Sequence, residues 1–269
     1  MTLRFGGLTS LDDVALEQRR GEILAVIGPN GAGKTSLFNC LTGVYRPQEG
    51  RFTFRPRVGV PFSVLVMAPW RVNRMGIART FQNIRLFGAL TAVENVKIGA
   101  ESMQHTGAVG AVLGLRRARR EERESDKTAF DLLEFVGLAS RANDLASAMP
   151  YGDQRRLEIA RAMATGPEVL LLDEPAAGTN PAEKLQLEEL IRRVAGTGVS
   201  VLLIEHDMRL VMSVAARVVV LNFGKVIAAG RPDQVRSDPA VVEAYLGGGD
   251  DDNSPAALTG EGDGDAARA

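Results

Sequence analysis

A glycine-rich segment at residues 28–35, GPNGAGKT, constrains the fold of this chain more than any other feature. It follows a short apolar run, EILAVI at residues 22–27, and precedes SLFNCLTG, which ends at Gly43. The apolar run predicts a buried strand, and the residues after the segment predict a helix that stops at the glycine. The segment is therefore predicted to be a tight turn that joins a strand to a helix.

The same segment has the residue types and spacing of a phosphate-binding loop, G-x-x-x-x-G-K-[ST]. Its glycines let successive backbone N–H groups turn toward phosphate oxygens, and the dipole of the helix N-terminus favours negative charge. Lys34 is predicted to reach the β- and γ-phosphates, and the hydroxyl of Thr35 is a candidate Mg²⁺ ligand. A glycine-rich turn that fits the pattern by chance is the alternative, and the predicted strand and helix argue against it. The candidate nucleotide-binding residues here are Gly28, Pro29, Asn30, Gly31, Ala32, Gly33, Lys34, Thr35 and Ser36.

A pair of carboxylates follows a second apolar run, in LLLDEP at residues 170–175. The run predicts a strand covered on both faces, so Asp173 and Glu174 are expected at the carboxyl edge of a parallel sheet, where ligands bind. Asp173 is a candidate Mg²⁺ ligand, directly or through water, and Glu174 is a candidate general base for the attacking water. The alternative is that both are acids at the start of the next helix.

The remaining pattern predicts an α/β fold with two additions. A strand at residues 200–204 and a helix at 182–194 continue a strand–helix alternation, which predicts a parallel sheet. Another helix is predicted at residues 155–164. The run RVVVLNFGKVIAAG predicts a hairpin that turns at Gly224 and Lys225.

Two regions look different from this core. Residues 86–149 contain no convincing strand and are expected to be helical. Within them, the arginines and glutamates at 116–124 predict a solvated helix face rather than a phosphate-binding patch. Residues 247–269 are expected to form a disordered acidic tail because they contain almost no large apolar side chains.

Composition excludes several classes of protein. The net charge of −1 gives no sign of a nucleic-acid-binding surface. A single cysteine, Cys40, argues against a disulfide framework and fits a reducing compartment. No segment has the roughly 18 to 20 continuous apolar residues needed to cross a bilayer, and the first residues lack the apolar core of a signal peptide. Any role at a membrane is therefore expected to depend on other subunits.

Three further segments occur in an informative order with the two motifs. They are RTFQN, which contains Gln82, MPYGDQRR at residues 149–156, and IEHD, which contains His206. Together the five segments resemble the ATPase subunits of ABC transporters, over roughly residues 3–246. The resemblance implies one domain at 1–246, with a P-loop core, a mostly parallel sheet, an antiparallel β subdomain and a helical subdomain inserted at about 83–150. It also implies a dimer that holds ATP between the P-loop of one subunit and the signature segment of the other.

The resemblance assigns roles by position. Gln82 is expected to sense the γ-phosphate, ligate Mg²⁺ and contact a permease, and His206 is expected to contact the γ-phosphate. Phe5 corresponds to the aromatic residue that stacks on adenine. Each has a simpler interpretation: a surface glutamine, a strand-end cap and a core phenylalanine. The segment expected to close on the ATP of the opposite subunit contains Tyr151, Gly152 and Asp153.

Three residues depart from the family pattern. Pro150 replaces the signature serine and offers neither a hydroxyl nor an N–H group. Asp153 brings a carboxylate near a triphosphate, which is repulsive unless Arg155 or Arg156 pairs with it. Asn180 stands where a loop aspartate is usual. Pro150 and Asp153 leave open a weakly hydrolysing regulatory partner of a second ATPase subunit, although Glu174 and His206 argue against it.

Within the superfamily, RTFQNIRLF, PYGDQRRLEIARAMA, LLLDEPAAGTNP, IEHDM and VVEAYLG resemble the importers of branched-chain amino acids and related amides. This resemblance implies ATP and Mg²⁺ as cofactors and a peripheral location on the cytoplasmic face of the cell membrane. Its implied partners are two transmembrane permease subunits, a second ATPase subunit and, indirectly, an extracytoplasmic solute-binding protein. Urea and other neutral amino acids remain alternative solutes. A soluble ABC ATPase acting on ribosomes or DNA is disfavoured because the chain has one cassette and no heptad run.

Overall fold

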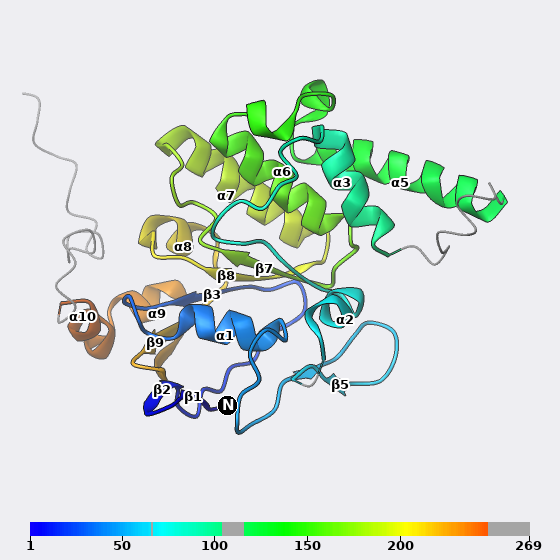
Figure 1. The fold of residues 1–269 in the computed structure, drawn as a ribbon. Coiled ribbons are helices and arrows are strands. Elements are labelled where there is room, and N and C mark those ends of the chain that lie inside the picture. Colours follow the sequence, from blue (N-terminus) through cyan, green and yellow to red (C-terminus); the bar gives the residue numbers. More distant parts are fainter. Residues whose placement is uncertain (66, 104–115, 247–269) are drawn as a thin grey trace, which may run out of the picture.

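The computed structural model describes residues 1–65, 67–103 and 116–246 (Figure 1). The predicted acidic tail at 247–269 lies outside these residues.

A six-stranded sheet in the order β10-β9-β3-β8-β7-β6 forms the centre of the molecule. Five neighbouring strands run parallel, and β10 pairs antiparallel with β9. Every residue of β3 and β8 is buried, as their continuous apolar runs predict. The predicted α/β fold with a mostly parallel sheet is therefore confirmed. The strands are β3 (Ile23–Ile27), β6 (Ile77–Arg79), β7 (Val169–Asp173), β8 (Ser200–Ile204), β9 (Arg217–Asn222) and β10 (Lys225–Gly230).

Helices cover both faces of this sheet. Helix α1 (Lys34–Leu41) lies on one face, with Leu37 and Phe38 buried against the strands. The opposite face is covered by α6 (Tyr151–Met163), α7 (Pro181–Gly196) and α8 (Met208–Val214) (Figure 1). The glycine-rich loop consequently emerges at the carboxyl edge of β3, next to the ends of β7 and β8.

A group of helices lies beyond α6 and α7 (Figure 1). Helix α3 (Ala92–Glu101) packs against α5 (Arg116–Phe135) and α6. Apart from one bridge between Thr91 and Leu145, the described part of 86–149 contains no strand. Exposed charges along α5 pair with each other in an i,i+4 pattern, which agrees with a solvated face. The shorter elements there are the 3-10 helices η1 (Ala139–Arg141) and η2 (Ala146–Ala148).

Small antiparallel units and terminal helices complete the fold. Strands β1 (Leu3–Phe5) and β2 (Leu8–Leu11) form one hairpin, and β4 (Thr53–Phe54) and β5 (Phe62–Ser63) form another. Helix α2 (Pro69–Arg74) leads into β6, while α9 (Pro232–Arg236) and α10 (Pro239–Leu246) pack near β9 and β10. No helix among the described residues is both long enough and apolar enough to cross a membrane.

Two predicted boundaries differ from the structure. The β9–β10 turn is at Phe223 and Gly224, both with positive φ, because Lys225 already pairs with Asn222. Helix α6 begins at Tyr151 rather than at 155, with Pro150 as its N-cap residue. Its first turn is polar and glycine-containing, so apolar periodicity gave no signal there.

Candidate active site

The glycine-rich loop between β3 and α1 depends on close backbone packing. Gly33 has a φ of 101°, and a Cβ atom there would lie 2.6 Å from the carbonyl oxygen of Ser10 on β2. A side chain at this position would therefore clash as well as strain the backbone. No side chain caps α1. The N–H groups of its first turn lack intrahelical acceptors, as in helix N-termini that bind anions.

Lys34 lies across its own loop. Its Nζ donates to the carbonyl oxygens of Gly28 at 2.6 Å and Pro29 at 3.0 Å. Burial lowers the pKa of Lys34, whereas the carboxylates of Glu174 and Asp173 act in the opposite direction. The lysine therefore places a positive charge in the loop beside the two predicted carboxylates.

The two hydroxyl residues that follow differ in their surroundings. Thr35 is exposed, whereas Ser36 is half-buried and its hydroxyl accepts a hydrogen bond from Ser10 Oγ at 2.7 Å. Strand β2 thus supports the start of α1 through Ser36. Thr35 remains exposed to solvent.

Asp173 ends β7 and forms a buried ion pair that the sequence did not reveal. Arg79 Nη2 lies 2.6 Å from Asp173 Oδ2, and the two side chains are 9% and 4% exposed. Arg79 also donates to Asn39 Oδ1 at 2.7 Å. The guanidinium therefore compensates the Asp173 charge and links it to α1. The only signal in the sequence was that Arg79 stands three residues before Gln82. Its contact with Asp173 depends on the pairing of β6 with β7, which the sequence does not show.

Three predicted catalytic residues converge beyond the ends of neighbouring strands. Gln82 follows β6, Glu174 follows β7 and His206 follows β8. Gln82 Nε2 donates to Glu174 Oε2 at 3.0 Å, and His206 Nδ1 lies 3.9 Å from the same oxygen. The Glu174 backbone has a φ of 46°, and its N–H donates to Ile204 O at 2.9 Å. The arrangement places an amide and an imidazole near the same carboxylate oxygen.

Helix α6 holds the backbone next to Gln82, which is another feature the sequence did not reveal. Arg155 Nη1 donates to Phe81 O at 2.8 Å, and Arg155 Nη2 donates to Gln82 O. Glu158 accepts from Phe81 N at 3.4 Å and lies 3.3 Å from Arg155. Both charged side chains are almost completely buried. The Gln82 loop is thus fixed to the helix that begins at the signature segment.

The Asp153 carboxylate is paired, but Arg155 does not provide the pairing. Arg156 Nη2 donates to Asp153 Oδ1, and Arg141 Nε lies 3.2 Å from Asp153 Oδ2. Tyr151 is exposed, and its hydroxyl accepts from Arg155 at 2.9 Å. The repulsion expected of a carboxylate in this segment is therefore reduced by two guanidinium groups.

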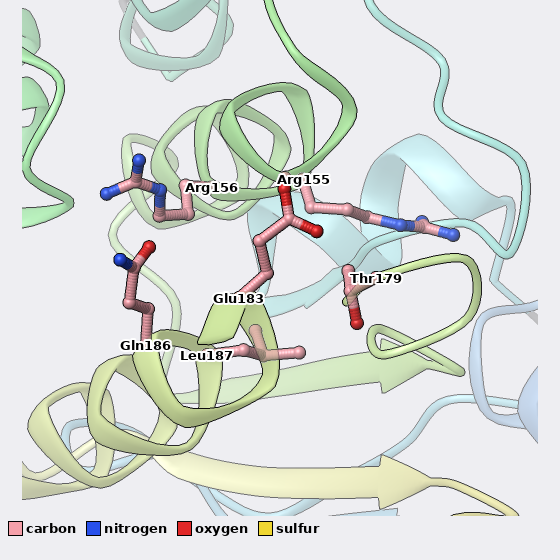
Figure 2. Close-up of a pocket in the computed structure, with 7 residues that line it drawn as sticks. Arg155, Arg156, Thr179, Glu183, Gln186 and Leu187 are labelled. Atoms are coloured by element: carbon pink, nitrogen blue, oxygen red, sulfur yellow. The ribbon is translucent and has the colours of Figure 1, made fainter. Parts of the chain in front are cut away.

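Gly152 packs closely against the next helix. A Cβ atom at Gly152 would lie 2.6 Å from Glu183 Oε1. Figure 2 shows Glu183 pointing from the first turn of α7 toward α6, across a small hollow that Thr179 also lines. Asn180 caps α7: its side chain accepts from Glu183 N at 3.0 Å, and the Glu183 carboxylate accepts from Asn180 N at 2.9 Å. The asparagine therefore makes the capping box that an aspartate makes.

Phe5 lies at the end of β1 and is not a core residue. The residue is 45% exposed, and its ring meets Tyr45 edge-on with centroids 5.2 Å apart. This exposure is compatible with a stacking surface, and the adenine contact remains a prediction.

A phosphate-binding loop on a mostly parallel sheet, with a carboxylate pair at the end of a nearby strand, defines the class of P-loop ATPases. Comparison with known proteins narrows this class. The ABC transporter family model matches residues 11–177, and the model for branched-chain amino acid ATP-binding cassette transporters matches residues 225–251. The chain belongs to the ABC transporter family as one of its ATP-binding ATPase proteins.

Several relatives are similar over nearly their whole length. The high-affinity branched-chain amino acid transport ATP-binding protein LivG of Salmonella typhimurium is 46% identical, covering 92% of this chain and 95% of its own. BraF of Pseudomonas aeruginosa, which carries the same description, is 45% identical with the same coverage. Among solved structures, the ADP conformation of MJ1267, an ATP-binding cassette of an ABC transporter, has a TM-score of 0.78 and 31% identity, covering 91% of this chain and 96% of that one.

Proposed function

We propose that this chain is the ATP-hydrolysing subunit of an importer for branched-chain amino acids or related neutral amino acids and amides. The convergence of Gln82, Glu174 and His206 beside the Lys34 loop carries the hydrolytic part of this proposal. The similarity to LivG and BraF over nearly the whole chain supports the solute class. We assign residues 1–246 to one domain, with a helical subdomain inserted at about 83–150.

The proposed nucleotide contacts come from the loop and from α1. On binding ATP, the Lys34 ammonium exchanges the carbonyl oxygens of Gly28 and Pro29 for the β- and γ-phosphates. The N–H groups at the start of α1 bind phosphate oxygens. Phe5, on the exposed edge of the β1–β2 hairpin, is proposed to stack on the adenine.

The donor set at this edge fits Mg²⁺. Asp173, the Thr35 hydroxyl and the side-chain carbonyl of Gln82 would provide hard oxygen ligands, and phosphates and water would complete the set. The described residues contain no group of three or more His, Cys, Asp or Glu side chains suited to a metal, and Mg²⁺ bound with a nucleotide needs none. When bound, Mg²⁺ supplies charge neutralisation on the phosphates.

In the proposed reaction, Glu174 orients the attacking water and accepts its proton. His206, which lies beside Glu174, donates a hydrogen bond to the γ-phosphate, and the Gln82 amide orients the carboxylate. Catalysis in such a site depends on positioning and on stabilising charge around the transferred phosphoryl group.

The proposed assembly contains two ATPase subunits, either identical or related. Each ATP lies between the P-loop of one and the segment Tyr151–Asp153 of the other. The ATPases bind two membrane permease subunits at the cytoplasmic face, and a solute-binding protein delivers the solute from outside. Urea remains an alternative solute. Pro150 keeps a regulatory partner with weak hydrolysis as a second candidate, although the pairing of Asp153 with Arg156 and Arg141 weakens the case for it.

Uptake of radiolabelled leucine, isoleucine and valine in a strain lacking the gene tests this proposal. Complementation is done with the wild-type chain and with Glu174→Gln at equal expression. The proposal expects uptake to fall on deletion and to be restored only by the wild type. Restoration by both chains would contradict hydrolytic coupling. Unchanged uptake of all three amino acids, together with loss of amide or urea uptake, would reject the branched-chain assignment.

A further inference from the structure

Glu205 is a completely buried carboxylate directly after β8, and the roles proposed so far do not use it. Its Oε1 accepts from Ala176 N at 2.7 Å. Its Oε2 accepts from His206 N at 3.1 Å and from Asp207 N at 3.4 Å. Each oxygen of one side chain thus serves a different segment, one following β7 and the other following β8. Burial raises the pKa of this carboxyl, and the three backbone N–H groups act in the opposite direction.

The segment bound by Oε1 needs support. Glu174 has a φ of 46°, a left-handed conformation that is costly for a residue with a Cβ atom. Such a conformation persists only where surrounding contacts over-determine it. The turn after it is closed by Ala177 N donating to Glu174 O at 3.2 Å. Ala176 lies within this turn, and its N–H donates to Glu205. The Glu205 carboxylate, which is not part of the turn, therefore stabilises it.

The segment bound by Oε2 contains His206. The N–H groups of His206 and Asp207 both point at Glu205, and Asp207 then caps α8. The His206 ring nitrogen Nδ1 lies 3.9 Å from Glu205 Oε2 and 3.9 Å from Glu174 Oε2. The imidazole therefore lies near both carboxylates, although it is itself half-exposed.

We propose that Glu205 is a positioning residue that joins the turn of Glu174 to the segment of His206, so that both reach the γ-phosphate in one fixed relative placement. The inference rests on the proposed roles of Glu174 and His206. It assigns Glu205 no contact with nucleotide, and its effect passes through these two residues.

The chemistry of a carboxylate is needed for this role. Both of its oxygens accept, whereas an amide of the same shape has one accepting oxygen and one NH₂ group that only donates. Glu205→Gln therefore keeps the volume but turns a donor toward either Ala176 N or the pair of N–H groups at His206 and Asp207. One of the two segments loses its acceptor, and their relative placement is no longer fixed.

The test compares Glu205→Gln with Glu22→Gln in the full-length chain. Glu22 is a matched control because it is also a carboxylate with a largely buried side chain, 8% exposed. It pairs with Arg217 at 2.9 Å, at the start of β3 and therefore at the opposite end of the sheet. For each variant, kcat and KM for ATP, the affinity for a fluorescent ATP analogue and the Tm are measured. Wild type and Glu174→Gln serve as references.

The proposal expects Glu205→Gln to lower kcat by about tenfold or more, with analogue affinity within about twofold of wild type, as for loss of an interaction made in the transition state. Glu22→Gln is expected to keep the wild-type kcat even if its Tm falls as far as that of Glu205→Gln. An unchanged kcat in Glu205→Gln overturns the proposal. So does a parallel loss of kcat and affinity that Glu22→Gln reproduces, since that indicates a purely structural role.

A replacement variant and the Glu174→Gln reference make failure of the Glu205 proposal distinguishable from failure of the proposed function. If Glu205→Gln does not fold, Glu205→Ser, which is smaller and leaves room for a bridging water, is measured in the same way with the same criteria. Near-normal turnover of Glu174→Gln would reject the proposed function itself. Loss of turnover in Glu174→Gln with normal turnover in Glu205→Gln would reject only the inference about Glu205.

Discussion

The side-chain amide of Gln82 donates a hydrogen bond to Glu174 Oε2 at 3.0 Å, across 92 residues of sequence. This bond uses the side-chain nitrogen of Gln82. The side-chain carbonyl oxygen remains as an electron-pair donor suited to a hard cation. One side chain can thus orient the proposed base and contribute a Mg²⁺ ligand. The Gln82 backbone is itself held by Arg155 on α6, so the placement of the base depends on the helix that begins at the signature segment.

Gln82→Ala is expected to lower ATP turnover by about tenfold, less than the roughly 100- to 10,000-fold contributed by a group that itself transfers the proton, because the amide only orients the base. It is also expected to raise the Mg²⁺ concentration needed for half-maximal activity, because one proposed ligand is lost. Steady-state ATPase assays across a Mg²⁺ titration measure both effects. Gln186→Ala, at an exposed position on α7, is the control. A Mg²⁺ dependence that is the same in both variants would contradict the ligand role.

Lys34→Ala is expected to weaken ATP binding by about tenfold or more, since charge-assisted hydrogen bonds contribute roughly 1.5–3 kcal/mol. Equilibrium titration with a fluorescent ATP analogue gives the affinity. Lys225→Ala removes the same charge from an exposed position on β10, where the lysine pairs with Asp12, and should leave affinity unchanged. Equal affinities of the two variants would remove Lys34 from the nucleotide site.

Arg79→Met is expected to destabilise the fold by about 3–5 kcal/mol, because it leaves the buried Asp173 carboxylate without its partner. The free energy of unfolding in urea measures this loss. Adding Asp173→Asn removes the unpaired charge and should recover part of the stability. If the double variant is as unstable as the sum of the two single variants predicts, the ion pair does not explain the loss.

Cys40 is expected to react very slowly with thiol reagents in the folded protein. Burial raises the pKa of its thiol to about 11 from the usual 9.0, so at pH 8 the reactive thiolate is roughly a hundredfold scarcer than for an ordinary thiol. Between pH 9.0 and about 11 the folded chain keeps this proton and the unfolded chain loses it. The free energy of unfolding therefore falls as the pH rises through this window. Labelling is followed by mass spectrometry with and without denaturant. Equal labelling rates would contradict the burial.

The sequence predicted the elements whose signals are local. β3, β7 and β8 are short apolar runs because helices cover both faces of the sheet, and the glycine-rich loop has a fixed spacing. β6 was not predicted, because three residues, Ile77–Arg79, are too few to show a period. The pairing of β6 with β7 then determines the contact of Arg79 with Asp173, and no local pattern reports it.

The supporting contacts of the site were also beyond prediction. Arg155 was expected only as a possible partner of Asp153, yet its guanidinium reaches the backbone of the Gln82 loop, and Arg156 pairs with Asp153 instead. Adjacent residues on a helix point about 100° apart, so their different partners depend on how α6 sits on the sheet. Glu205 likewise has a role only once β7 and β8 are neighbours.

ATP turnover by Glu174→Gln, together with its affinity for an ATP analogue, tests the proposed hydrolytic site most directly. Glu174 is the group proposed to take the proton from water, and glutamine keeps its shape without its basicity. We predict ATP affinity within about twofold of wild type and turnover lower by about 100-fold or more, in line with the contribution of a general base. Turnover close to wild type, with binding intact, would show that another group activates the water and would contradict the assignment of Glu174 as the base.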